Sequence, residues 1–223
     1  MSANLPVTNA DENNQRLFEG ERLPLSRYAL FFVPAIVGLS VDLWTKSYMF
    51  ANYFRPEVAD PNSIHFGPQD PAWCIDGIFG IQTSTNPGAL FGIGSGYSWL
   101  FSVFSIIAIT GILIWLFAFK GILDRWLTFA LGLITGGILG NLYDRLGFGF
   151  TEGFPESIRT NVRDWILFRL EGVPYFDPWP NFNIADAVLV TGAIMLFVHA
   201  FFFQPPDEAV DKAPSESEST ATE

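Results

Sequence analysis

The sequence is poor in the side chains that usually hold metal ions or form disulfide bonds. It has one cysteine, Cys74, and two histidines, His65 and His199, among 223 residues. A single cysteine excludes an internal disulfide framework, and so few nitrogen and sulfur ligands argue against a zinc site. We therefore expect no metal and no cofactor, and we expect Cys74 to be an ordinary loop thiol. Any chemistry must use carboxylates, amides, hydroxyls, lysine or arginine.

Charge is scarce in the middle of the chain, although the formal net charge is -11. Many of the acidic residues lie in the two ends, 1–21 and 207–223. The N-terminus lacks the short basic region that precedes the apolar core of a cleaved signal peptide, so we expect the first apolar stretch to be retained. Residues 1–27 are expected to form a cytoplasmic N-terminal segment, and residues 204–223 a disordered acidic tail.

Apolar residues, in contrast, make up 49% of the chain. A helix needs about 20 mainly apolar residues to cross the hydrocarbon core of a membrane. Four stretches meet this requirement, at approximately residues 28–50, 97–119, 126–143 and 184–203. The sequence therefore predicts an α-helical membrane protein with four transmembrane helices within residues 28–203.

Two polar segments, 51–96 and 146–182, separate the helices. Short apolar runs among Pro, Gly, Asp and Asn, such as residues 77–83, predict strands and turns at the membrane surface. Four crossings place both segments on one side, where we expect a small β-rich platform. The 12 Lys and Arg residues divide equally between the two sides, so charge bias alone leaves the orientation open. Arg22 and Arg27 favour a cytoplasmic N-terminus and an extracytoplasmic platform.

Asp42 and Lys46 lie within the first apolar stretch, one helical turn apart and on the same face. An unpaired charge at that depth costs on the order of several kcal/mol, so a partner or a water-filled cavity is expected. A structural ion pair and a functional site are both compatible with this pattern. In the third stretch, Gly132, Gly136 and Gly140 recur every four residues, which predicts the close approach of another helix.

The later polar residues also have structural interpretations. Asn141 shares a helix face with Asp144 and Arg145, which would suit a solvated cap at the membrane interface. Asn183 can cap the fourth helix, and Asp186 in the first turn suits the helix dipole.

Two segments outside the helices are equally ambiguous. Asp164 follows Asn-Val-Arg in the segment before the fourth helix and, taken alone, would be a surface acid in a loop. The Gly-rich run at residues 85–96 has no strand before it and no basic residue after it, so it is poor support for phosphate binding. It could as well be a re-entrant turn.

The order of these motifs resembles lipoprotein signal peptidase, also called signal peptidase II, from about Tyr28 to Phe203. The matching motifs are Asp42 to Lys46, NPGALF at 86–91, GNLYDR at 140–145, VRDW at 162–165 and FNIADA at 182–187. Two departures stand out. Residues 146–163 are longer than the link usual in that family, and Leu90 stands where the family often has a small residue.

The resemblance implies cleavage of the signal peptide from bacterial prolipoproteins just before a diacylglyceryl-modified cysteine, near the extracytoplasmic face of the inner membrane. The catalytic pair would be Asp164 and Asp186. The positions that would line or order the site are Asn86, Gly88, Asn141, Arg145 and Asn183, and the supporting polar positions are Asp42, Lys46 and Asp144. The expected partners are diacylglyceryl-modified prolipoproteins and membrane lipids. We expect no nucleic-acid partner and a monomeric protein.

Two close carboxylates that share one proton can activate water and protonate the leaving amine. Other classes would explain charge at membrane depth differently. A transporter or proton-conducting protein predicts internal repeats of helices, which we do not find. A presenilin-like peptidase would carry a GxGD signature, which is missing. A non-catalytic scaffold would tolerate Asp→Asn substitutions at both candidate catalytic positions.

Overall fold

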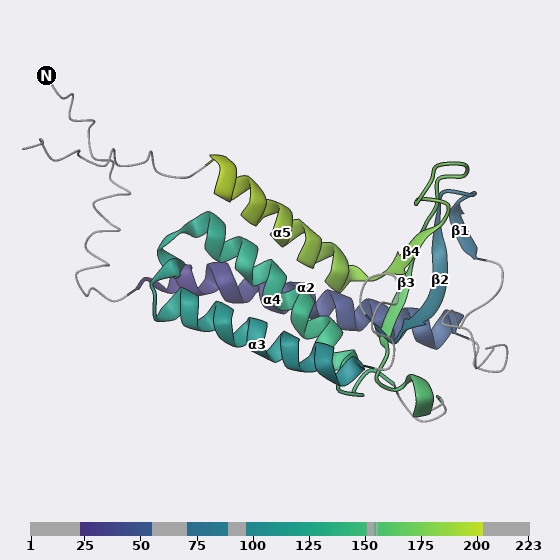
Figure 1. Cartoon of the computed structure of the whole chain (residues 1–223), viewed down its shortest axis with the longest axis horizontal. Coiled ribbons are helices and arrows are strands. Elements are labelled where there is room, and N and C mark those ends of the chain that lie inside the picture. The colour runs from purple at the N-terminus through teal and green to yellow at the C-terminus, as the bar shows by residue number, and fades with distance from the viewer. Residues whose placement is uncertain (1–22, 55–70, 89–96, 151–153, 155, 203–223) are drawn as a thin grey trace, which may run out of the picture.

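The computed structural model describes residues 23–54, 71–88, 97–150, 154 and 156–202. Within these ranges, four helices are long and apolar enough to cross a membrane. They are α2 (Leu25–Tyr53), α3 (Ser98–Phe117), α4 (Arg125–Arg145) and α5 (Ile184–Phe202). Figure 1 shows them as a bundle with a sheet at one end. The predicted helical membrane protein with four spanning helices is confirmed, and α2 extends beyond the predicted stretch at both ends.

Helix α4 is the centre of the bundle because it packs against each of the other three helices. Its glycines permit the close approach. A Cβ atom added at Gly136 would lie 2.7 Å from the carbonyl oxygen of Ala35 on α2, and one at Gly132 would lie 2.5 Å from that of Phe31. Gly137 makes a similarly close contact with α5. The predicted role of these glycines in helix packing is therefore confirmed.

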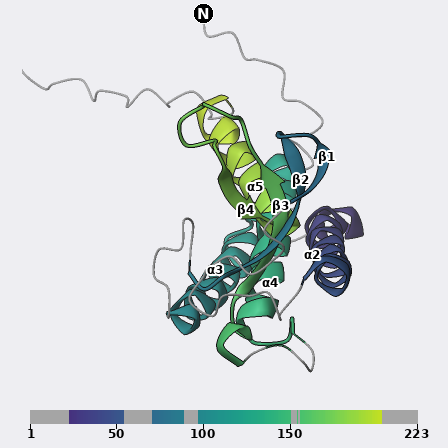
Figure 2. The ribbon, with the colours of Figure 1, turned by 90° about the vertical axis from the view of Figure 1, so that its right-hand side faces the viewer.

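The β-rich platform is a four-stranded antiparallel sheet in the order β1-β2-β3-β4. Its strands are β1 (Ala72–Ile75), β2 (Phe79–Asn86), β3 (Val162–Phe168) and β4 (Trp179–Phe182). Figure 2, an end-on view, shows the strands running across the near end of the bundle. We call this the sheet end. Cys74 was expected in a loop, but it lies exposed in strand β1.

The long stretch after α4 contributes to an aromatic core between α2 and β3. Phe150 stacks edge-on against Phe50 of α2, with ring centroids 6.0 Å apart. The short helix η4 (Glu156–Ile158) adds the buried Ile158, and Trp165 of β3 completes the contact. This core fixes β3 against the end of α2.

The opposite end of the bundle, which we call the hairpin end, joins α3 to α4 through the short helix η3 (Gly121–Leu123). Arg27 of α2 is buried there and donates hydrogen bonds to the carbonyl groups of Ile122 and Leu123. Asp124 caps α4 and also contacts His199 of α5, with 2.7 Å between the side-chain atoms. The connection between α3 and α4 is therefore held by contacts from α2 and α5.

Candidate active site

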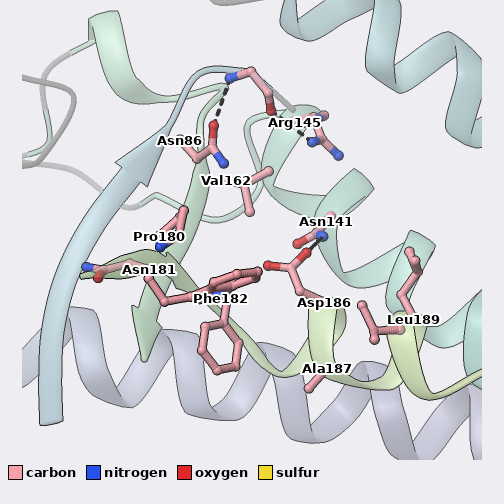
Figure 3. Close-up of a pocket in the computed structure, with 13 residues that line it drawn as sticks. Asn86, Asn141, Arg145, Val162, Pro180, Asn181, Phe182, Asp186, Ala187 and Leu189 are labelled. Carbon is pink, nitrogen blue, oxygen red and sulfur yellow. Dashed lines mark hydrogen bonds between the residues drawn. The ribbon is translucent and has the colours of Figure 1, made fainter. Parts of the chain in front are cut away.

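A pocket of about 360 Å³ opens at the sheet end, where α4, α5, β2 and β4 meet. It is lined by Asn86, Gly88, Asn141, Arg145, Val162, Trp179, Pro180, Asn181, Phe182, Asp186, Ala187, Leu189 and Val190. Figure 3 shows Asn141 and Asp186 turned toward one another at the wall formed by α4 and α5. Five of the ten predicted site residues therefore line one cavity: Asn86, Gly88, Asn141, Arg145 and Asp186.

Asp186 lies in the first turn of α5, and Asn183 caps that helix as predicted. The backbone N–H of Asp186 donates to Asn183 Oδ1 at 2.9 Å, and the backbone N–H of Asn183 donates to Asp186 Oδ2 at 3.3 Å. This reciprocal pair has the form of a capping box. Asn141 Nδ2 donates to the other carboxylate oxygen, Asp186 Oδ1, at 2.8 Å. Both oxygens of Asp186 therefore face N–H donors, and the side chain borders the pocket.

Asp164 is not a surface acid in a loop, as its sequence context alone suggested. It lies in strand β3, is 2% exposed and sits behind the pocket wall, outside the set of lining residues. Asn183 Nδ2 donates to Asp164 Oδ1 at 2.6 Å, so one buried amide joins both candidate catalytic residues. The strand was not recognised in the sequence because all of β3 except Phe168 is buried. It therefore lacks the alternation of polar and apolar residues that marks a half-exposed strand.

The surroundings of Asp164 change its acidity. Burial is the largest effect and raises the pKa of this carboxyl well above its usual range, and the negative charge of Asp186 raises it further. Lys46 and the side-chain amides of Asn183 and Asn86 act in the opposite direction. Asp164 and Asp186 are therefore close enough for the charge of Asp186 to disfavour the ionised form of Asp164.

A layer of buried charge lies beneath the pair. Lys46 Nζ is 2.8 Å from Asp42 Oδ2, 3.1 Å from Asp144 Oδ2 and 3.0 Å from Asn141 Oδ1. Lys46, Asp42 and Asp144 are all 0% exposed. The partner that we expected for the charges of the first helix is therefore supplied by α4. Of the three predicted supporting residues, Lys46 contacts Asn141 of the pocket, and Asp42 and Asp144 contact Lys46.

Arg163 belongs to the same layer and was not identified from the sequence. Its Nη2 and Nε lie 2.8 and 2.9 Å from Asp144 Oδ1, and its backbone N–H donates to Asp144 Oδ2 at 3.1 Å. The guanidinium also lies 5.7 Å from the ring centre of Phe150 and 5.9 Å from that of Phe50. A basic residue within an otherwise apolar run, directly before Asp164, is the signal that could have identified it.

Asn86, Gly88 and Arg145 form another part of the pocket. Gly88 donates its backbone N–H to Asn86 Oδ1 at 3.0 Å, and Arg145 Nη2 donates to the carbonyl oxygen of Gly88 at 3.3 Å. Figure 3 shows these contacts as dashed lines above the pocket. The guanidinium of Arg145 also lies 5.4 Å from the ring centre of Phe101 on α3. Leu90 and the rest of the Gly-rich run to residue 96 lie outside the described residues.

The chemical groups of the site are carboxylates, amides and one guanidinium. In the part of the chain that the structure describes, no three His, Cys, Asp or Glu side chains are grouped as a metal site requires. What the geometry offers is a carboxylate at a pocket and a second carboxyl group buried behind it. Asn183 contacts both, donating its backbone N–H to Asp186 Oδ2 and its side-chain N–H to Asp164 Oδ1. Such a pair of differently placed carboxyl groups is suited to general acid–base chemistry.

Comparison with known proteins assigns the chain to a family. The model of signal peptidase (SPase) II matches residues 34–202. The chain is 50% identical to the lipoprotein signal peptidase of Rhodopirellula baltica over 183 residues, 82% of this chain and 76% of that protein. It is 29% identical to the lipoprotein signal peptidase of Geobacillus thermodenitrificans over 82% of this chain and 96% of that protein.

A solved structure described as a bacterial membrane enzyme has the same fold. It superposes with a TM-score of 0.56 at 25% identity, covering 77% of this chain and 92% of that one. Together with its four apolar helices, these matches make the chain a multi-pass membrane peptidase. The resemblance seen in the sequence motifs is confirmed, and the chain belongs to the signal peptidase II family.

Proposed function

We propose that Asp164 and Asp186 are the catalytic pair of this peptidase and that they activate a water molecule for peptide hydrolysis. Membership of the signal peptidase II family supports the broader activity, removal of the signal peptide from prolipoproteins. The observation that carries the finer proposal is the unequal environment of two carboxyl groups, both of which accept a hydrogen bond from Asn183. One borders the pocket, and the other is buried with a raised pKa.

This difference suggests a role for each residue. Asp186, with N–H donors on both oxygens, is the base that takes a proton from water as the water oxygen bonds to the scissile carbonyl carbon. Asp164 holds the proton that the pair shares, because burial disfavours its charged form. The pair then returns a proton to the leaving amine as the carbon–nitrogen bond breaks. Asn86 and Arg145, in the same pocket, are placed to bind the substrate backbone.

The pocket also suits a lipid-modified substrate. Its α5 and β4 walls carry apolar residues, among them Leu189, Val190 and Phe182, and Val190 is 54% exposed on the membrane-spanning helix. Acyl chains and the signal helix could therefore remain in lipid while water reaches Asp186 from the sheet end. We place this end at the extracytoplasmic face of the bacterial inner membrane. We propose that the substrates are diacylglyceryl-modified prolipoproteins and that the enzyme acts as a monomer in contact with membrane lipids.

The test is cleavage of a diacylglyceryl-modified prolipoprotein by the purified protein in detergent or lipid. Asp164→Asn and Asp186→Asn should each lower turnover by about 10²- to 10⁴-fold, the usual contribution of general acid–base catalysis, or more. The matched control is Asp177→Asn, since Asp177 lies in the exposed loop before β4 and pairs with Arg169. Normal turnover in both dyad variants, with the fold retained, would contradict the proposed catalytic pair.

A further inference from the structure

The side-chain amides of Asn141 and Asn183 form a hydrogen-bond chain with a fixed direction. Lys46 Nζ contacts Asn141 at 3.0 Å, and because an ammonium group only donates, the atom that faces it must be the amide oxygen. At the other end, the backbone N–H of Asp186 contacts Asn183 at 2.9 Å, so that atom must also be an amide oxygen. Both amide nitrogens are thereby turned toward the candidate catalytic pair.

Each amide nitrogen then serves one member of the pair. Asn141 Nδ2 donates to Asp186 Oδ1 at 2.8 Å, and Asn183 Nδ2 donates to Asp164 Oδ1 at 2.6 Å. Asn183 Nδ2 also donates to Asn141 Oδ1 at 3.1 Å. The oxygen of Asn141 therefore accepts from Lys46 and from Asn183, and Lys46 supplies the charged donor. If the Asn141 amide were reversed, its oxygen would face Asp186 and two acceptors would meet.

The amide orientation matters because the two carboxyl groups differ in what surrounds them. N–H donors on both oxygens of Asp186 suit a carboxylate, which can only accept, whereas Asp164 is buried in β3. The charged groups around the pair are Asp42 and Lys46 on α2, Asp144 and Arg145 on α4, and Arg163 on β3. Asp42, Lys46, Asp144 and Arg163 balance one another, so removal of a charge-matched pair leaves the layer neutral.

We propose that Lys46 is a positioning residue that acts through Asn141. It holds the Asn141 amide in the orientation that donates to Asp186 Oδ1, a hydrogen bond that stabilises the charged form of this carboxyl group. The inference rests on the proposed catalytic pair and goes beyond it, because a purely structural ion pair with Asp42 and Asp144 would require a cation but no particular orientation of Asn141.

The main test is the double variant Asp42→Asn/Lys46→Met, which removes the donor and keeps the charge layer neutral, since the Asp144–Arg163 pair remains. Without Lys46 the ionised forms of the pair lose a donor and a nearby positive charge. Both limbs of the pH profile of kcat/KM should move to higher pH by about one unit, a tenfold change in the protonation ratio. Lys46→Arg keeps a donor-only cation and should restore the original limbs.

Asp42→Asn alone is the matched control. It keeps Lys46 and leaves its charge less compensated, so the limbs should stay in place or move to lower pH, opposite to the double variant. If the double variant does not fold, as judged by thermal unfolding in the same detergent, Lys46→Gln replaces it. A glutamine side chain both donates and accepts, so it no longer selects the oxygen of the Asn141 amide, and it also lacks the positive charge; it should therefore raise the limbs as well.

Two outcomes overturn the positioning role: unchanged limbs in the folded double variant or in Lys46→Gln, and an upward shift in Asp42→Asn alone. The failure of the underlying catalytic pair looks different. In that case the unmodified protein has no bell-shaped pH profile, or Asp164→Asn and Asp186→Asn remain active.

Discussion

Both ends of the helical bundle hold charged side chains, but they use them differently. At the hairpin end, Arg27 donates to backbone carbonyls and Asp124 caps α4, so charge fixes the ends of helices. At the sheet end, the charges of α2, α4 and β3 neutralise one another in a buried layer, and Asp164 and Asp186 are held by neutral amides beside a pocket. Charge at membrane depth therefore does not itself mark a catalytic site. What distinguishes the proposed catalytic site is two carboxyl groups that accept hydrogen bonds from amides, one of which borders a pocket.

An Asp→Asn substitution at each end of the bundle should give the largest difference in stability. Asp144→Asn leaves Lys46 and Arg163 with excess buried positive charge, and breaking such a buried pair costs ~3–5 kcal/mol. Asp124→Asn keeps an equally good helix cap and loses a partly exposed contact with His199, which is worth ~0–1 kcal/mol. Unfolding of the two variants in detergent measures the difference. Equal losses of stability would show that the charge layer at the sheet end is not structurally special.

The glycines of the bundle allow a second contrast, between packed and lipid-facing positions. Gly136→Ala should destabilise the bundle by ~1–3 kcal/mol, because the added methyl group meets the backbone of Ala35 on α2. Gly111→Ala is the control: it lies on α3, where an added Cβ atom meets nothing within 4 Å, and its melting temperature should be unchanged or slightly higher. A Gly136→Ala variant as stable as Gly111→Ala would mean that α2 and α4 can separate without cost.

Much of this arrangement follows from local sequence patterns. The four spanning helices are continuous apolar stretches. Gly132, Gly136 and Gly140 recur every four residues, and helical geometry alone places them on one face. The Asn183–Asp186 cap is also local, since its two hydrogen bonds join residues three positions apart. Such features can be predicted because the information lies within one or two helical turns.

The burial of Asp164 and the role of Arg163 could not be predicted from the residue pattern, because both depend on contacts between distant segments. Asp164 is buried because β3 is a central strand, paired on one side with β2 in the register Ser84↔Asp164 and on the other with β4. The same strand carries Arg163 to Asp144, 19 residues away along the chain. Neither the register nor the covering of both faces of β3 can be read from a seven-residue segment that shows no alternation. The family resemblance identified Asp164, whereas the residue pattern alone placed it on the surface.

A smaller effect is expected from Asp164→Asn, which should gain stability while it loses activity. Its folded-state pKa is raised, so its contribution to stability is fully present below the unfolded pKa of about 3.9 and is lost as pH rises through the folded value. Asp164→Asn removes a carboxyl group whose charged form is disfavoured in the folded protein but not in the unfolded chain, while its amide oxygen can still accept from Asn183. The inactive variant should therefore melt above the unmodified protein at neutral pH, with the gap closing toward pH 4. A gap that widens on acidification would show that burial does not penalise this carboxylate.

The smallest effect should come from Asp177, an exposed carboxylate at the same end of the bundle. The backbone N–H of Gly172 and then the side chain of Arg169 lower the pKa of Asp177. The sign is opposite to that of Asp164: the contribution is present above the unfolded pKa of about 3.9 and is lost as pH falls through the folded value. Below pH 4 the loop amide of Gly172, which donates to Asp177 Oδ2 at 2.9 Å, should lose protection from hydrogen exchange. Asp177→Asn should weaken this pH dependence without altering global unfolding. If the same loss of protection in acid occurs in Asp177→Asn, another group causes it.

Asp164 and Asp177 lie in the same sheet region but differ in burial. Opposite slopes of stability with pH would therefore show that burial, not location at the sheet end, sets the chemistry of a carboxylate here.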